Sequence, residues 1–237
     1  MRRLGPIAFI LLAALAVAVV GVPTLISAVA PSFIGRVPPF RGQAVSVQVE
    51  ASFGGLVGGR LDRVRLSGTA LKLGGVAFGS LDIALTGVGL DRSFASLAGT
   101  ADGVTTGAFG ATAITLHGVT ISGSSAGGIS LTGTIDAATV ESLVVARFAA
   151  AGLAGASARL ESGSVTITIR GETVHATLAV VGGAVTLDPG GLASSIVVLE
   201  PDGSMPGRVV GLDVAPTGVT VHWRIEPADL GILLGGG

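Results

Sequence analysis

The sequence predicts a mostly β fold with one central helix, an α+β arrangement in which a curved antiparallel sheet or an elongated barrel wraps partly around that helix. Three observations support this prediction. Apolar and polar residues alternate with a period of two in many short segments, glycine-containing turns separate these segments, and a single internal segment has helical spacing instead. An uncharged run from Leu4 to Ala30 adds an N-terminal transmembrane helix to the prediction.

The first half of the domain is predicted to be all β. Between 45 and 53, Val45, Val47, Val49, Ala51 and Phe53 alternate with polar residues, which buries one face of a strand. The same type of pattern predicts further strands at 60–67, 70–76, 80–88, 113–121 and 128–135.

The pattern changes once, after Asp136, which can cap a helix over 137–151. The apolar residues of this helix follow helical spacing at Val140, Leu143, Val144 and Phe148. Alternation then returns at 165–169 and 174–178, with Gly171-Glu172 as a two-residue hairpin turn, and continues at 184–187, 196–199 and 219–225. The helix interrupts the strands and no fixed repeat is visible, so a β-solenoid is not predicted.

The N-terminal segment is either a cleaved signal peptide or a retained anchor. Its apolar run is longer than the about 7–15 residues of cleavable signals. Ala28-Val29-Ala30 resembles a cleavage site, but Pro31 follows it and disfavours cleavage. With Arg2 and Arg3 retained inside, we expect a cell-membrane protein anchored by a single helix, with everything after Pro31 on the extracytoplasmic side.

This gives four expected parts: a membrane anchor at 1–30, a Pro-rich linker at 31–42, a β-rich domain at 43–230 and a flexible tail at 231–237. The chain contains no cysteine, so no disulfide can stabilise it. Hydrophobic residues make up 49% of the chain, enough for a substantial core. Charged residues are only 12% and the net charge is −1, which argues against nucleic acid as a partner.

Several of these segments together resemble the LmeA-type family of bacterial cell-envelope proteins. The resemblance is carried by the runs 45–90, 133–136 with the following helix, 160–169, 185–189 and 211–225. It implies a fold similar to tubular lipid-binding domains, and an extracytoplasmic protein that binds phospholipid and supports the maturation of envelope lipids or lipoglycans. Members of that family often carry a lipidation cysteine or a cleavable signal, whereas here the N-terminal helix would provide the tether.

Lipid binding also follows from the predicted fold, because a sheet curved around a helix can leave an apolar interior that holds acyl chains. The candidate lining residues are Phe53, Phe78, Leu143, Val144, Phe148 and Trp223. Ordinary core residues have the same spacing, so both interpretations stay open.

Two further groups of residues are candidates for contact with lipid. Arg60, Arg63 and Arg65 could hold a phosphate head group, since guanidinium groups match phosphate oxygens; a solvated strand face is the alternative. Leu56 and Val57, flanked by glycine pairs, could insert into a bilayer from a mobile hairpin tip; a simple flexible loop is the alternative.

No catalytic or metal site is predicted. Gly123-Ser124-Ser125-Ala126-Gly127 matches G-x-S-x-G, but a strand pattern follows the serine where a nucleophile elbow needs a helix. His117, His175 and His222 lie on three separate predicted strands without ligand spacing. We therefore expect a phospholipid-binding protein without enzymatic activity or cofactor; the alternative is a structural or adhesive surface protein with a packed core. The oligomeric state is not predicted.

Overall fold

The computed structural model describes residues 44–73, 76–89, 91, 93–107, 113–190, 195–200 and 207–233. The predicted anchor, the linker and the last four residues of the predicted tail lie outside these ranges. Within them, none of the helices has the length and apolar character needed to cross a membrane.

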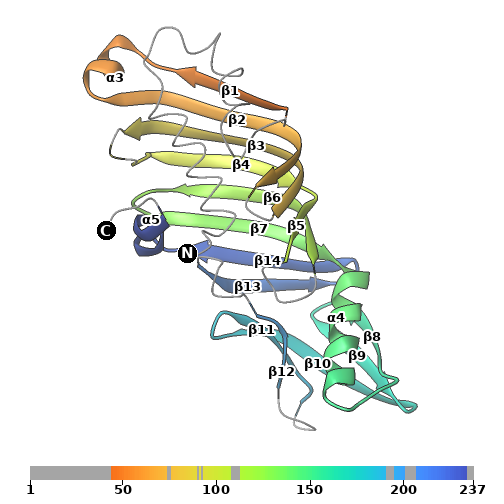
Figure 1. Cartoon of the computed structure of the whole chain (residues 1–237). Helices are drawn as coiled ribbons and strands as arrows, with labels where there is room; N and C mark the ends of the chain where they lie inside the picture. The colour runs from red at the N-terminus through yellow and green to blue at the C-terminus, as the bar shows by residue number, and fades with distance from the viewer. Residues whose placement is uncertain are drawn as a thin grey trace.

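The described residues form two antiparallel sheets (Figure 1). The larger sheet contains β1 (Val45–Glu50), β2 (Arg60–Leu73), β3 (Val76–Gly89), β4 (Ser96–Asp102), β5 (Val104–Thr106), β6 (Ile114–Ser124), β7 (Gly128–Asp136), β13 (Arg208–Ala215) and β14 (Gly218–Ile225). The smaller sheet contains β8 (Ser157–Glu161), β9 (Ser164–Ile169), β10 (Glu172–Val181), β11 (Ala184–Asp188) and β12 (Ile196–Leu199). Three helices, α3 (Phe53–Val57), α4 (Ala137–Ala150) and α5 (Pro227–Leu233), complete the described chain.

The larger sheet is open and strongly curved. Its strand order is β1-β2-β3-β4-β6-β7-β14-β13, with β5 pairing with both β3 and β6, and the smaller sheet has the order β12-β11-β10-β9-β8. The mostly β character and the curved antiparallel arrangement are therefore confirmed. The elongated barrel is wrong for the described strands, because β1 and β13 end the order without pairing with each other.

A crease crosses four strands of the larger sheet. Along each strand the buried residues occupy every second position. In β2, β3, β6 and the β4–β5 segment this series shifts by one residue at Ala70, Gly79, Gly118 and Gly103, respectively. Ala70, Gly103 and Gly118 have φ of 51°, 58° and 56°, which breaks the two-residue alternation of a flat strand. The strand ends beyond the crease turn over the inner face and are called the lip here; they are Leu71–Leu73, Val76–Phe78, Val104–Thr106 and Ile114–Leu116 (Figure 1).

Helix α4 begins where predicted. Asp136 caps it by accepting a hydrogen bond of 2.9 Å from the Thr139 amide. Its buried residues are the four that the helical spacing identified. The helix does not lie within the larger sheet, however: it packs between the end of β7 and β14 and the strands β8 and β12 of the smaller sheet (Figure 1). The predicted central position of the helix is therefore wrong, although its existence and buried face are confirmed.

Other boundaries differ from the prediction for local reasons. The predicted strands 60–67 and 70–76 are largely one bent strand, β2, because the left-handed Ala70 bends the chain without ending it. The hairpin turn is Arg170-Gly171, both with positive φ, one residue earlier than expected. Helix α5 reaches Leu233 and so occupies the first part of the predicted tail.

Candidate functional site

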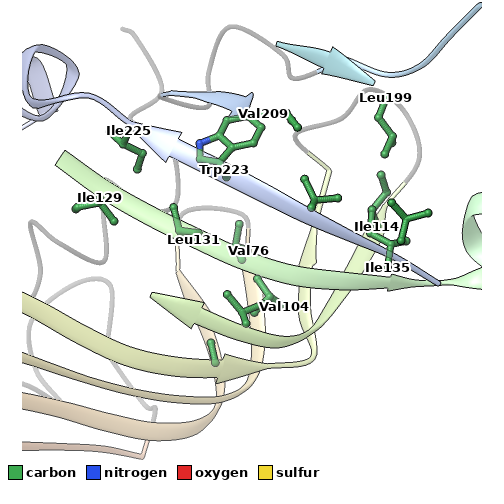
Figure 2. Close-up of a cluster of buried hydrophobic side chains, with 14 of the residues drawn as sticks. Val76, Val104, Ile114, Ile129, Leu131, Ile135, Leu199, Val209, Trp223 and Ile225 are labelled. Atoms are coloured by element: carbon green, nitrogen blue, oxygen red, sulfur yellow. The ribbon is translucent and has the colours of Figure 1, made fainter. Parts of the chain in front are cut away.

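The inner face of the larger sheet contains an apolar cavity. The walls come from the strands β3, β4, β6, β7, β14 and β13 of the larger sheet, from the lip, and from one residue each of β11 and β12, Val185 and Leu199. Figure 2 shows Trp223, Val209, Leu131 and Val104 directed into this shared interior. Among the described residues that line the cavity, Thr106 has the single polar side chain and none is charged. The remaining lining residues are Val76, Phe78, Ile83, Leu97, Ala101, Leu116, Val119, Ile121, Ile129, Gly133, Ile135 and Val221.

The enclosed void is small in the present conformation. Its volume is about 70 Å³, whereas the space between atoms in the whole groove, including its open mouth, is about 1000 Å³. The smaller value decides what fits without movement, because the larger one includes solvent. An apolar cavity of about 150 Å³ accepts benzene and ligand pockets span about 300–1,000 Å³. An acyl chain would therefore fit only if the cavity walls moved apart. The lip is the part of the wall that lies beyond the crease.

Two of the six predicted lining residues lie at the cavity. Phe78, on the lip, and Trp223, on β14, are both 4% exposed and both contribute to its wall. Trp223 is the only tryptophan of the chain. The sequence pattern correctly assigned its side chain to the inner face.

The other four predicted lining residues are elsewhere. Leu143, Val144 and Phe148 are buried on α4, but they belong to the core between the sheets and not to the cavity wall. Phe53 is a clear correction: β1 ends at Glu50, and Phe53 lies on α3 with 84% of its surface exposed. Ser52 caps a helix that begins at Phe53, so Phe53 does not continue the alternation of β1 and its side chain is not directed to the core.

The predicted head-group arginines lie on the outer face of the sheet, opposite the cavity. Arg63 and Arg65 do share a face, as predicted, but the residue between them, Val64, is the one that points to the core. The Arg65 Nε donates to Asp82 at 2.8 Å, and this pair lowers the pKa of the Asp82 carboxyl. Arg63 and Arg65 are therefore directed away from the cavity, and their contact with a phosphate head group stays a prediction. Arg60 is exposed at the start of β2.

The predicted tip lies where β1 joins β2, but its exposed residues differ from the prediction. Val57 is 75% exposed, as expected for membrane contact, whereas Leu56 packs partly against the core. Phe53, one helical turn before Val57, takes the exposed position instead. The sequence pattern did not predict that Phe53 is exposed in place of Leu56, because it assigned Phe53 to a strand.

The outer face of the sheet carries a hydrogen-bonded chain of Thr132, His222 and Asp213. Thr132 Oγ1 lies 3.1 Å from His222 Nδ1, and Asp213 Oδ2 lies 2.7 Å from His222 Nε2. This resembles the connectivity of a nucleophile, base and acid, but Thr132 lies within β7 and pairs with both Thr120 of β6 and His222 of β14. Because sheet pairing occupies the backbone on both sides, no free pair of amides is available there to stabilise an oxyanion.

The serine of the G-x-S-x-G match has a structural contact. Ser125 Oγ donates to the Phe94 carbonyl at 2.9 Å and accepts from the Phe94 amide at 3.2 Å, which ties the β6–β7 turn to the segment before β4. Among the described residues, no group of three or more potential ligands could hold a metal ion.

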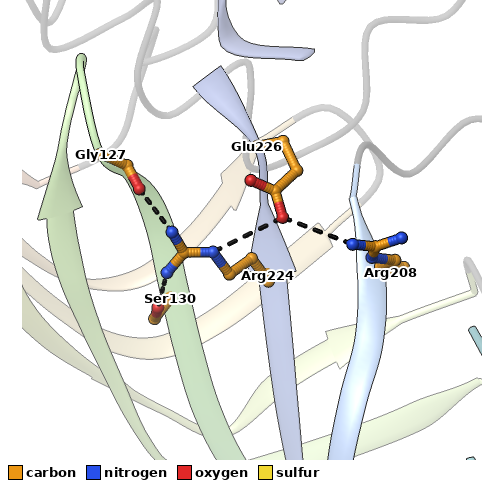
Figure 3. Close-up of polar contacts among 5 residues, drawn as sticks. All are labelled: Gly127, Ser130, Arg208, Arg224 and Glu226. Atoms are coloured by element: carbon orange, nitrogen blue, oxygen red, sulfur yellow. Dashed lines mark hydrogen bonds and ion pairs between the residues drawn. The ribbon is translucent and has the colours of Figure 1, made fainter. Parts of the chain in front are cut away.

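Charged residues of the outer face tie together the three strands beside the cavity (Figure 3). Arg224 Nη2 donates to the Gly127 carbonyl at 2.6 Å, and Nη1 donates to Ser130 Oγ at 3.2 Å. Glu226 lies 3.6 Å from both Arg224 Nε and Arg208 Nη2. These contacts link β7, β14 and β13 on the face opposite Trp223.

Apart from Phe78, sequence reasoning did not identify the residues on the lip side of the cavity. Val76, Val104 and Leu116 line it, yet the strands that carry them were predicted without their bend or, for β4 and β5, were not predicted. One signal was present in the sequence. The shift in the buried positions coincides with Gly79, Gly103 and Gly118, and these glycines interrupt the alternation of apolar and polar residues.

Comparison of the chain with protein-family models, with curated proteins and with solved structures found no match.

Proposed function

We propose that the protein is an extracytoplasmic, membrane-tethered lipid-binding protein whose cavity holds an acyl chain of a phospholipid or a related envelope lipid. The observation that carries this proposal is the composition of the cavity wall: in the part of the chain that the structure describes, nineteen residues from both sheets line it, and only Thr106 of these has a polar side chain. Such a wall excludes charged and strongly polar ligands, because burying their polar groups without partners is costly.

An acyl chain matches this wall for a second reason. Its binding depends on the burial of apolar area, about 0.8 kcal/mol for each CH₂ group, and requires no directional contact. The polar head group would stay at the open mouth of the groove, in water or at a membrane surface. Binding needs no chemical step, and we propose none. The resemblance to LmeA-type proteins is consistent with this function and with a role in the maturation of envelope lipids.

Trp223 offers a direct test. The full chain, kept in solution lipid-free by an amphipathic polymer, is titrated with a phospholipid brominated on its acyl chains, because bromine quenches tryptophan only at short range. Trp223 is the only tryptophan and lines the cavity, so its fluorescence reports occupancy. We expect saturable quenching near one lipid per chain. Quenching that is absent, or that does not saturate, contradicts the proposal.

A second candidate function is a structural or adhesive surface protein that binds no ligand in its core. The specific observation in its favour is the void of about 70 Å³, smaller than the cavity that accepts benzene. For this alternative the same titration gives no quenching at Trp223, and the cavity counts as an ordinary packing defect.

A further inference from the structure

The segment between β1 and β2 presents an apolar surface to solvent. Phe53 and Val57 are 84% and 75% exposed, the two highest values among the exposed large hydrophobic residues of the described chain. They are separated by four positions on α3, so they lie on the same side of that helix. Glycines occupy most of the neighbouring positions, and α3 projects from the end of the sheet (Figure 1). We call Phe53 and Val57 the apolar tip.

Polar contacts hold this tip in place. Ser52 Oγ accepts from the Gly55 amide at 3.1 Å, and the Leu56 amide donates to the Ser52 carbonyl at 3.0 Å. Asp62 on β2 accepts from both the amide and the hydroxyl of Ser52. Leu56 packs back against the core. The apolar tip is therefore presented outward by a fixed turn, and not exposed by a loose one.

We propose that the apolar tip inserts into the interface of the lipid bilayer in which residues 1–30 are expected to be anchored. This goes beyond acyl-chain binding, because a membrane contact at α3 does not depend on the cavity. The charged residues nearest to the tip in the sequence, Glu50, Arg60, Asp62 and Arg63, include both signs. The contact is therefore apolar and not an attraction to anionic lipid, so it should be independent of salt and of lipid charge.

The length of the chain outside the described residues supports this choice of partner. Residues 31–43 can span up to about 45 Å when extended. Strand β1, which separates the start of the domain from α3, has six residues and a length of about 20 Å. Residues 31–43 are therefore long enough, if extended, for α3 and the end of the expected anchor to meet the same membrane surface.

The absence of cysteine allows a site-specific test in the full chain. The variant Val57→Cys is labelled with an environment-sensitive fluorophore and reconstituted in phosphatidylcholine vesicles that contain a lipid-borne quencher at shallow depth. Val181→Cys is the matched control, because Val181 is also an exposed valine, at 60%, but lies at the end of β10 in the smaller sheet. We expect the label at position 57 to shift to the blue and to lose most of its emission to the quencher, while the label at position 181 is unaffected.

Three outcomes would overturn the proposal. The first is that both labels behave as they do in water, or that the chain does not associate with the vesicles. The second is quenching that appears only with anionic lipid and disappears in salt. The third is a blue shift without lipid quenching that depends on protein concentration, which would mean that a second copy covers the tip. None of these depends on Trp223, so failure here and failure of lipid binding in the cavity can be distinguished.

Discussion

Filling the cavity should stabilise the protein and abolish lipid binding at the same time. Ala101 on β4 is 3% exposed and contributes to the cavity wall, so Ala101→Leu places additional methyl groups in the void. The destabilisation caused by a cavity grows by about 24 cal/mol per Å³. For a void of about 70 Å³, complete filling therefore raises the free energy of unfolding by up to about 1.7 kcal/mol. For a domain of this size, that corresponds to an increase in Tm of about 3–7 °C.

The assay is urea and thermal unfolding of the lipid-free full chain, followed by the fluorescence of Trp223. The matched control is Ala176→Leu, since Ala176 is 1% exposed on β10 but does not line the cavity. Overpacking at that position should cost about 1–3 kcal/mol. The two variants should thus change stability in opposite directions, and Ala101→Leu should lose quenching by brominated lipid. If Ala101→Leu destabilises the protein as much as Ala176→Leu, the void does not accept added apolar groups and the proposed binding site is wrong.

Three other predictions concern α4, the outer face and the crease. Asp136→Ala should lower the free energy of unfolding by about 1 kcal/mol at pH 7, while Asp136→Asn, which can also cap, should lower it by less. Hydrogen bonds from the Thr139 side chain and amide lower the pKa of Asp136. The stability that the Asp136 carboxylate adds over asparagine is therefore present above the unfolded-state pKa of about 3.9 and is lost as the pH falls through the lower folded-state pKa. Unfolding of the wild-type protein and of Asp136→Asn across this pH range measures this difference in stability, and a difference that does not change with pH would contradict the prediction. Arg65→Ala should leave the quenching of Trp223 by brominated lipid unchanged, because the Arg65–Asp82 pair lies on the face opposite the cavity. A weakened affinity would contradict this and would support the predicted head-group role. Gly103→Ala should cost about 1–2 kcal/mol because φ is +58° there, and Gly107→Ala, which meets open space, should cost less in the same unfolding assay.

The periodicity of the sequence predicted the local structure where the pattern is continuous. The alternation at Val219, Val221, Trp223 and Ile225 correctly gave both strand β14 and its buried face. The helical spacing after Asp136 likewise gave α4 and its buried residues. In both cases the local pattern and the tertiary burial coincide, because one face of each element meets the core along its whole length.

The rest depends on information that periodicity does not contain. Whether a buried residue lines a void or fills the core is a property of the whole interior, so Phe78 and Phe148 could not be distinguished from sequence. The position of Phe53 depends on a cap, Ser52, and on the distant carboxylate of Asp62 that holds it. The partner of Asp82, Arg65, is seventeen residues away in the chain and becomes its neighbour only through the β2–β3 register.

The proposed function requires that the cavity on the inner face of the larger sheet accepts an acyl chain. A crystal structure of the protein with a phospholipid brominated on its acyl chains tests this requirement, because anomalous scattering locates the bromine atoms. We expect bromine peaks between Trp223 and Phe78, with the lip displaced from its present position. Peaks confined to the outer surface, with the void of about 70 Å³ empty and the lip unmoved, would show that the cavity does not bind lipid.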